Sequence, residues 1–355
     1  MQQILEQFQS QVRAAAAGKR ALRIRGGGTK DWYGQRIEGE ILDTRAYSGI
    51  VDYEPTELVI TARCGTPLRD IEAALAERKQ MLAFEPPHFG EGATLGGMIS
   101  AGLSGPRRAS SGALRDFVLG AKLLDGKGEV LSFGGKVMKN VAGYDVSRLL
   151  AGSMGTLGLL LEVSVKVLPV AYREATLRFS MNETDAIRKL NEWAGQPLPI
   201  SGSCWHEGVL ALRLSGAQAA VDAALRSLGG AHGGELMPDC DRFWASLREQ
   251  RHAFFDGEAP VWRLSVPSTF GAIDLGPQLI EWGGAQRWLR ADGDAATAQR
   301  IRATVAACGG HATLFRGGDK SAGVFQPLAP AIAKIHERLK AGFDPSNIFN
   351  PGRMY

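Results

Sequence analysis

A short strand that runs directly into three consecutive glycines is the feature that most constrains this chain. Residues 22–25 alternate apolar and basic side chains, and Gly26-Gly-Gly-Thr-Lys30 follows at once. Glycine permits positive φ and lets a ligand approach the backbone closely, and successive free N–H groups in such a turn form a concave anion site. The spacing is neither G-x-x-x-x-G-K-[ST] nor G-x-G-x-x-G. It predicts a backbone site for a diphosphate, and a glycine-rich turn without a ligand is the alternative.

Length and composition predict two globular domains. The chain has 355 residues and a formal net charge of +4 without a dense basic run, which argues against nucleic acid as a partner. The cysteines, Cys64, Cys204, Cys240 and Cys308, lie too far apart for an iron–sulfur cluster or a zinc site within the chain. We find neither a signal peptide nor a membrane-spanning run, so we expect a cytoplasmic chain with reduced thiols.

Hydrophobic periodicity predicts helices and strands over the first 170 residues. Thr66 is expected to cap a helix whose first residue is Pro67, and residues 51–56 are expected to form a turn-rich connection. The other expected elements are a helix over 1–17, strands over 22–25, 40–44, 58–62 and 159–168, and a hairpin over 117–133. A second glycine-rich turn is expected over 151–158.

The stretch from 84 to 106 is rich in Gly, Ser and Thr and contains no Lys or Arg. A solvated loop of this length would usually carry more charge. The composition indicates either backbone that packs closely against a flat surface or a tightly packed helix of small residues. Both interpretations remain open on the residues alone.

The second half of the chain alternates between strand and helix patterns. Strands are expected over 174–180, 208–214, 261–266 and 285–290, and helices over 183–194, 216–228, 240–252 and 294–307. This alternation predicts a separate antiparallel sheet with helices on one face. The last fifteen residues are again turn-like.

Four motifs occur together and in order. They are Arg25-Gly-Gly-Gly-Thr29, Gly92-Ala-Thr-Leu-Gly-Gly97, Lys139-Asn-Val-Ala-Gly-Tyr-Asp145 with Gly152-Ser-Met-Gly-Thr-Leu-Gly158, and Phe343-Asp-Pro-Ser-Asn-Ile-Phe-Asn-Pro-Gly352. As a set they resemble the FAD-linked oxidase family, which carries the vanillyl-alcohol-oxidase-type (PCMH-type) FAD domain. The resemblance covers residues 1–170 and the tail. It implies an α+β fold, with a two-subdomain FAD-binding domain over 1–170, an α+β cap domain with an antiparallel sheet over 171–340, and a segment over 341–355 that returns to the first domain.

The resemblance also implies which residues hold FAD. Gly26, Gly27, Gly28 and Thr29 would wrap the diphosphate, with Lys30 near it. The segment that follows the ribityl chain and the flavin would consist of Pro86, Pro87, Thr94, Leu95, Gly96 and Gly97, and then Gly102 and Ser104. The second loop would contribute Gly152, Ser153, Gly155 and Thr156. Leu160 would make a backbone contact to the adenine, and Asn350 would close the flavin side of the site.

Two departures from the family pattern bear on how the flavin is attached and on whether a metal is bound. Members with covalent flavin usually have a His beside the first glycine loop, where this chain has Thr29 and Lys30, so we expect FAD to be bound non-covalently. Metal-dependent members carry a His-x-His pair in the cap domain. The cap histidines here are isolated in sequence and predict no metal: His206, His232, His252 and His311.

Within the family, the likeness is greatest to FAD-binding subunits of bacterial glycolate oxidases, which are assembled with a second flavin subunit and an iron–sulfur subunit. This implies oxidation of glycolate to glyoxylate, in the cytoplasm or at the inner membrane through the complex. Arg316, then Arg263, are candidates for binding a substrate carboxylate, and ion pairing at the surface or at a subunit contact is the alternative. Three other functions stay open: a self-contained FAD-dependent D-2-hydroxy acid (D-lactate) dehydrogenase, a non-catalytic electron-transfer or assembly subunit, and a flavin-free structural subunit.

Overall fold

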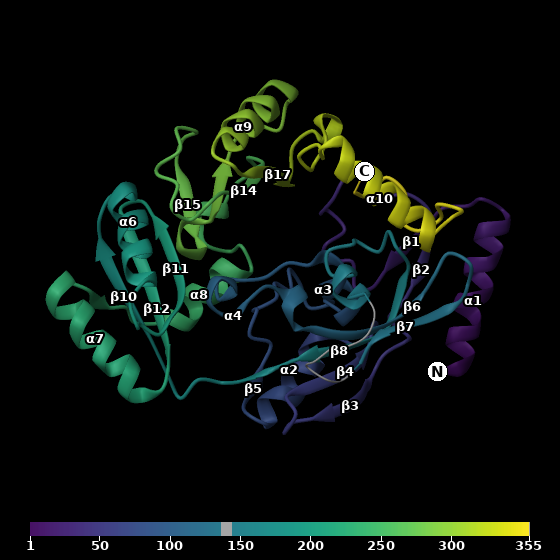
Figure 1. Cartoon of the computed structure of the whole chain (residues 1–355), viewed down its shortest axis with the longest axis horizontal. Helices are drawn as coiled ribbons and strands as arrows, with labels where there is room; N and C mark the ends of the chain where they lie inside the picture. The colour runs from purple at the N-terminus through teal and green to yellow at the C-terminus, as the bar shows by residue number, and fades with distance from the viewer. Residues whose placement is uncertain (136–143, 355) are drawn as a thin grey trace. The chain divides into compact units, whose positions relative to one another are not determined.

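The computed structural model describes residues 1–135 and 144–354 (Figure 1). The chain forms two compact units: a first unit of residues 1–103, 113–169 and 327–355, and a second unit of residues 104–112 and 170–326. These units divide the chain differently from the expected domains, since residues 327–340 belong with the first unit and 104–112 with the second. Most of the expected Lys139–Asp145 motif lies outside the described residues.

The first unit is built on a five-stranded antiparallel sheet in the order β3-β4-β8-β6-β7. Its strands are β3 (Ile50–Glu54), β4 (Val59–Arg63), β6 (Val118–Leu124), β7 (Val130–Gly134) and β8 (Leu159–Lys166). Two small pairs accompany it, parallel β1 (Leu22–Arg25) with β2 (Glu40–Asp43), and antiparallel β5 (Gln80–Met81) with β9 (Leu168–Pro169). Strand β8 is central and buried along nearly its whole length, which explains its continuous apolar sequence.

The helices of the first unit are α1 (Gln2–Ala17), α2 (Leu68–Glu77), α3 (Leu95–Ala101), α5 (Val146–Leu149) and α10 (Pro330–Phe343), with a 3₁₀ turn at Leu114–Phe117. Helices α1, α2 and α3 bury apolar residues, whereas the buried residues of α5 and α10 are Ser147 and Lys340. Helix α1 buries Phe8, Val12 and Ala15 and ends at Gly18, as its periodicity predicts. No helix in the described ranges is long and apolar enough to cross a membrane.

Two local expectations in the first unit are wrong. Residues 50–54 form strand β3 rather than a turn, and the strand is an exposed edge paired only with β4, so its sequence lacks a strong apolar pattern. Thr66 does not cap α2, because its hydroxyl exchanges hydrogen bonds with the backbone of Gly49 at 2.9 and 3.2 Å. Pro67 is therefore the N-cap, and the helix begins at Leu68.

Part of the small-residue stretch is a helix. Thr94 caps α3 by accepting a hydrogen bond from the Gly97 N–H at 3.3 Å, and Gly102 ends it in the left-handed region with φ +65°. A Cβ at Gly96 would lie 2.8 Å from the Cβ of Cys64, so only glycine lets this helix lie against the preceding segment. Of the two interpretations left open, the helix of small residues is found over 95–101, and residues 84–94 lie outside regular helix and strand.

The second unit holds an eight-stranded antiparallel sheet in the order β13-β10-β12-β11-β15-β16-β14-β17. Its strands are β10 (Arg173–Ser180), β11 (Ile200–His206), β12 (Val209–Gly216), β13 (Glu235–Leu236), β14 (Val261–Ser265), β15 (Gln278–Glu281), β16 (Gln286–Arg290) and β17 (His311–Arg316). The helices are α4 (Arg108–Ser111), α6 (Glu183–Ala194), α7 (Gln218–His232), α8 (Cys240–Arg248) and α9 (Ala295–Ala307), with 3₁₀ turns at Ala253–Phe255, Trp282–Gly284 and Lys320–Ala322. The expected separate antiparallel sheet is confirmed.

The helices of the second unit cover both faces of its sheet. Leu177 and its register partner Leu212 share an apolar cluster with residues of α6 and α7. The neighbouring pair, Thr176 and Arg213, points to the opposite face, where the Trp244 indole of α8 donates to Thr176 at 2.9 Å. The expectation of helices on one face is therefore wrong, because α8 covers polar residues that sequence periodicity does not mark as buried.

Candidate functional site

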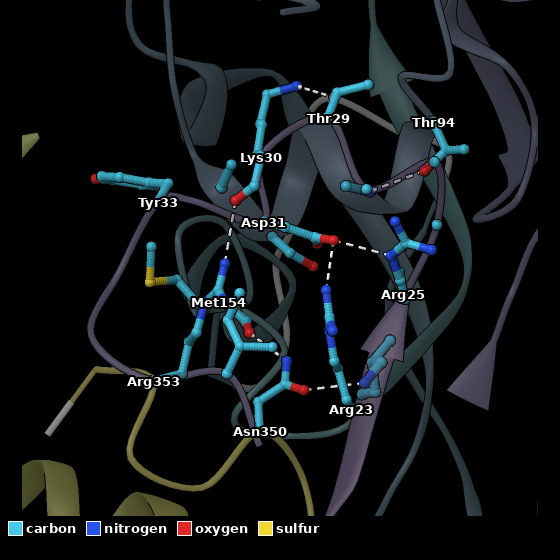
Figure 2. A pocket seen from close by; sticks show the side chains of 18 of the residues that line it. Arg23, Arg25, Thr29, Lys30, Asp31, Tyr33, Thr94, Met154, Asn350 and Arg353 are labelled. Carbon is cyan, nitrogen blue, oxygen red and sulfur yellow. Dashed lines mark hydrogen bonds and ion pairs between the residues drawn. The ribbon is translucent and has the colours of Figure 1, made fainter. Parts of the chain in front are cut away.

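A pocket opens at the first glycine loop, where three segments of the first unit meet (Figure 2). The loop from Gly26 to Lys30 forms one wall, α3 contributes Thr94 and Gly97 from its start, and the C-terminal tail contributes Asn350 and Arg353. The pocket thus joins residues from both ends of the chain. Strand β1 leads into it and positions the loop.

The three glycines of the loop are required by close packing. A Cβ at Gly27 would lie 1.5 Å from the carbonyl oxygen of Gly92, and one at Gly26 would lie 2.3 Å from the Thr94 hydroxyl. Gly28 has φ +73°, which favours glycine. Within the described residues, the N–H groups of Gly27 and Gly28 donate no hydrogen bond. They are available to an anion.

Basic side chains dominate the charge of this pocket. Asp31 pairs with both Arg23 and Arg25, at 2.9 Å from the Arg25 Nε (Figure 2). Arg353 donates to the carbonyl oxygen of Lys30 at 3.1 Å. Burial lowers the pKa of Arg353, and the neighbouring charge of Arg23 lowers it further, whereas Asp31 opposes both.

Lys30 itself turns away from this cluster. Its ammonium donates to the carbonyl oxygen of His88 at 3.1 Å and lies 5.6 Å from the centre of the Phe89 ring. The Trp32 indole donates to the Thr29 carbonyl oxygen at 3.0 Å and packs against the same Phe89 ring. These contacts fasten the end of the loop to residues 88–89.

Asn350 joins the two glycine-rich loops. Its side-chain oxygen accepts a hydrogen bond from the Ile24 N–H at 2.9 Å, and its amide donates to the Met154 carbonyl oxygen at 2.7 Å (Figure 2). The buried ammonium of Lys340 supports the same region by donating to Thr156, Phe349 and the carboxylate of Asp344. The tail is therefore held in place by buried polar contacts.

A second, less polar hollow adjoins the first. Gly155 and Leu160 line it together with Cys64, and it shares Gly97 and Asn350 with the first pocket. Burial raises the pKa of the Cys64 thiol to about 12, so this thiol is protonated and unreactive near neutral pH. Together the two hollows offer a cationic end and an apolar end.

A family model described as "FAD binding domain" matches residues 4–134. The chain is 49% identical over 346 residues, 97% of its own length, to the glycolate oxidase subunit GlcE of Escherichia coli (strain K12), of which the match covers 95%. This chain belongs to the FAD-linked oxidase family. FAD is accordingly its cofactor, and the expectations for family, α+β fold and cofactor are confirmed.

Two more distant relatives and a solved structure extend the picture. A D-lactate dehydrogenase of Archaeoglobus fulgidus is 27% identical, over 93% of this chain and 85% of that protein. The glycolate oxidase subunit GlcD of Bacillus subtilis (strain 168) is 32% identical, over 42% of this chain and 31% of that protein. The structure of an alkyldihydroxyacetonephosphate synthase matches with a TM-score of 0.66 and 14% identity, over 97% of this chain and 73% of that one, and this likeness concerns the fold.

The residues of the first pocket fit the family's cofactor. Free loop N–H groups and a surplus of guanidinium groups suit a diphosphate, and the apolar hollow that Leu160 lines suits a heteroaromatic ring. A methyl group at Gly26 would collide with the Thr94 hydroxyl, and one at Gly27 with the Gly92 backbone, so the loop keeps this shape only with glycine. The first unit therefore offers a pocket whose lining suits FAD.

The residues expected to hold FAD fall into three groups. Those lining the two hollows are Gly26, Gly27, Gly28, Thr29, Lys30, Thr94, Gly96, Gly97, Gly155, Leu160 and Asn350. Thr156 lines a third hollow with Lys340 and Asn350. Outside the linings of these hollows lie Pro86, Pro87, Leu95, Gly102, Gly152 and Ser153, while Ser104 belongs to the second unit. Leu95 is a core residue at 2% exposure, and Gly102 packs on Gly152, where a Cβ would lie 2.7 Å from the Gly152 Cα.

Sequence reasoning missed several side chains that line the first pocket. They are Arg23, Arg25, Asp31, Tyr33, Met154 and Arg353. The two strand arginines alternate with apolar residues directly before the glycines, which is a usable signal. Arg353 is a single arginine near the end of a turn-like tail, so no local pattern distinguishes it.

The two candidate substrate-binding arginines lie on neighbouring strands of the second unit. The Arg263 guanidinium lies 5.6 Å from the centre of the Phe315 ring, and Arg316 donates to the Phe255 carbonyl oxygen at 3.4 Å. Burial lowers the pKa of Arg316, and nearby Arg290 lowers it further. Neither Arg263 nor Arg316 makes an ion pair with a carboxylate among the described residues.

Two of the four cap histidines are not isolated in space. The rings of His206 and His252 lie 5.3 Å apart, edge to face, and both contact phenylalanine rings. Burial lowers the pKa of both. Among residues 1–135 and 144–354, no group of three or more His, Cys, Asp or Glu side chains is arranged to hold a metal ion. The pair is therefore an aromatic contact that the wide sequence spacing hides.

Proposed function

We propose that this chain is the FAD-binding subunit of a glycolate oxidase, which oxidises glycolate to glyoxylate and passes electrons to an iron–sulfur subunit. The observation that carries the proposal is 49% identity to the E. coli GlcE subunit over 97% of this chain. Because the match extends through both units, it concerns the second unit as well as the shared FAD-binding domain. The second flavin subunit would be a protein like GlcD, whose name also contains glycolate oxidase.

FAD would be held without a covalent bond. No histidine or cysteine lines the first pocket, as far as the structure describes it, and the Cys64 thiol of the second hollow is buried and has a raised pKa. His88 is engaged with Glu72, at 3.1 Å from its ring nitrogen. When bound, FAD supplies the hydride-accepting chemistry, and this chain supplies binding, orientation and charge.

Arg316 and Arg263 would bind the carboxylate of the hydroxy acid. Both are half-buried guanidinium groups without a carboxylate partner in the described residues, and aromatic rings lie beside them. A guanidinium group binds a carboxylate through two parallel hydrogen bonds. The cost of burying these charges would be offset when an anion arrives.

A self-contained D-2-hydroxy acid dehydrogenase is the second candidate. It is favoured by the likeness to the A. fulgidus D-lactate dehydrogenase, which extends over 93% of this chain. A third possibility within the same complex is an electron-transfer or assembly subunit whose flavin does not meet substrate. The spacing of the cysteines does not suit an iron–sulfur cluster, so in the complex the electrons would leave through another protein.

Anaerobic reduction of the flavin by substrate tests these candidates. The purified chain is mixed with excess glycolate or D-lactate, and bleaching of the flavin absorbance is followed. We expect slow or no bleaching by the chain alone, and rapid bleaching after co-expression with the second flavin subunit and the iron–sulfur subunit. Rapid bleaching of the isolated chain by D-lactate would instead establish the self-contained dehydrogenase.

A pair of variants locates the substrate site in the same assay. Arg316→Gln in the co-expressed complex should slow bleaching at limiting glycolate by about tenfold or more, because a charge-assisted hydrogen bond contributes about 1.5–3 kcal/mol. The matched control is Arg178→Gln, which alters an exposed arginine of the second unit that pairs with Glu235. Equal rates in the two variants would exclude Arg316 from substrate binding.

A further inference from the structure

Three guanidinium groups cluster with the carboxylate of Asp31 at the first pocket. Arg23 and Arg25 both pair with Asp31, and Arg353 lies close enough to both Arg23 and Asp31 for their charges to shift its pKa (Figure 2). Arg353 makes no ion pair of its own among the described residues. The cluster therefore carries a surplus of two positive charges.

Hydrogen bonds to the backbone and the side chain of Arg353 hold it in position. Its carbonyl oxygen accepts a hydrogen bond from the Gln35 N–H at 2.8 Å, and the Gly352 carbonyl oxygen accepts one from the Arg36 N–H at 3.1 Å. Its guanidinium donates to the Lys30 carbonyl oxygen, at the end of the glycine loop. Backbone contacts on one side and a loop contact on the other hold the side chain at the pocket.

We infer that Arg353 is a cofactor-binding residue that completes, with Arg23 and Arg25, a charge-matched seat for the diphosphate of FAD. The inference rests on the proposed binding of FAD in this pocket. Each of the two phosphates in FAD carries one negative charge, so the anion balances the surplus of the arginine cluster. The seat joins strand β1 to a residue far beyond position 134, where the match to the FAD-binding family model ends.

The charges of the cluster favour binding of an oxyanion over a purely structural role for these arginines. Like charges that are partly shielded from water repel each other unless an anion compensates them, and the side chains of Arg23 and Arg25 are 24% and 36% exposed. The carboxylate of the cluster, Asp31, is already shared between two arginines, and the other carboxylate of the pocket lining, Glu38, pairs with Arg36. The planar guanidinium of Arg353 has further N–H donors that can bind a phosphate, which explains why a partly buried arginine lies at this position. Asp31 acts as a positioning residue that orients Arg23 and Arg25.

Binding of FAD, ADP and adenosine to flavin-free protein tests the inference. ADP carries the diphosphate and adenosine lacks it, so the two probes separate charge from ring binding. Arg353→Gln should weaken FAD and ADP by about tenfold or more, since a charge-assisted hydrogen bond contributes this much, and should leave adenosine unchanged. Arg353→Lys should recover part of the loss because it restores the charge. Titration calorimetry at two salt concentrations should also show a weaker salt dependence for Arg353→Gln.

A matched control separates local from general effects of removing a cation. Arg20→Gln alters an exposed arginine of the same unit that pairs with Glu40 and lines neither hollow, so its affinities should equal those of the wild type. If Arg353→Gln left the affinity for ADP unchanged, or weakened adenosine as much as ADP, the role of Arg353 would be overturned while the proposed function would stand. Wild-type protein that binds no FAD would overturn the proposed function together with this inference.

Discussion

Replacing Gly27 with alanine should remove FAD from this protein while leaving the first unit folded. A methyl group at this position would lie 1.5 Å from the Gly92 carbonyl oxygen, whereas real contacts of this kind stay above 3.0 Å. The obstacle is backbone, so no side-chain rotation relieves it. The loop and residue 92 must move apart by about the difference, at a cost of about 1–3 kcal/mol of strain.

That displacement acts directly on the anion site. The N–H groups of Gly27 and Gly28 are free in the described structure, and moving them by more than 1 Å would break their hydrogen bonds to a phosphate. Each such bond to a charged group contributes about 1.5–3 kcal/mol. Loss of two should therefore weaken FAD by about a hundredfold or more.

The assay is the ratio of flavin to protein after purification, followed by titration of FAD into the flavin-free variant. Thermal unfolding shows whether the unit remains folded. Gly342→Ala is the matched control, because a Cβ at this helical glycine meets nothing within 4 Å, and it should bind FAD normally and be stabilised by about 0.5–1 kcal/mol. Full flavin content and unchanged affinity in Gly27→Ala would show that this loop is not the diphosphate site.

Two further outcomes follow from the site and from the second unit. Acid precipitation should release all flavin into the supernatant, because the pocket offers no described attachment residue, and flavin in the pellet would contradict non-covalent binding. The half-buried His206 and His252 should destabilise the second unit as the pH falls below about 6.5, because their lowered pKa values mean that the unfolded chain binds protons first. The decrease in melting temperature from pH 7.5 to pH 5.5 should be smaller in His206→Phe than in the wild type. An identical decrease would exclude the histidine pair as the cause of the pH dependence.

Local patterns in the sequence were sufficient for most individual elements. Helix α1, strand β8 and the β6–β7 hairpin follow from periodicity and turn residues, because each depends mainly on neighbours within a few positions. The first glycine loop follows in the same way, since the demand for small residues is visible in the residues themselves. Edge strand β3 was missed because an exposed strand carries little apolar signal.

The tertiary structure alone decided how distant segments assemble into a site. Asn350 meets Ile24 across 326 positions, and Arg353 meets Lys30 across 323, so no periodicity or motif spacing connects them. His206 and His252 come together in the same manner. Sequence by itself determined the glycine loop and the family motifs, because backbone geometry restricts residue type locally. Which side chains share Asp31, and where the tail closes the pocket, depends on the packing of the whole unit, since buried charges and polar groups find their partners only after the chain has folded.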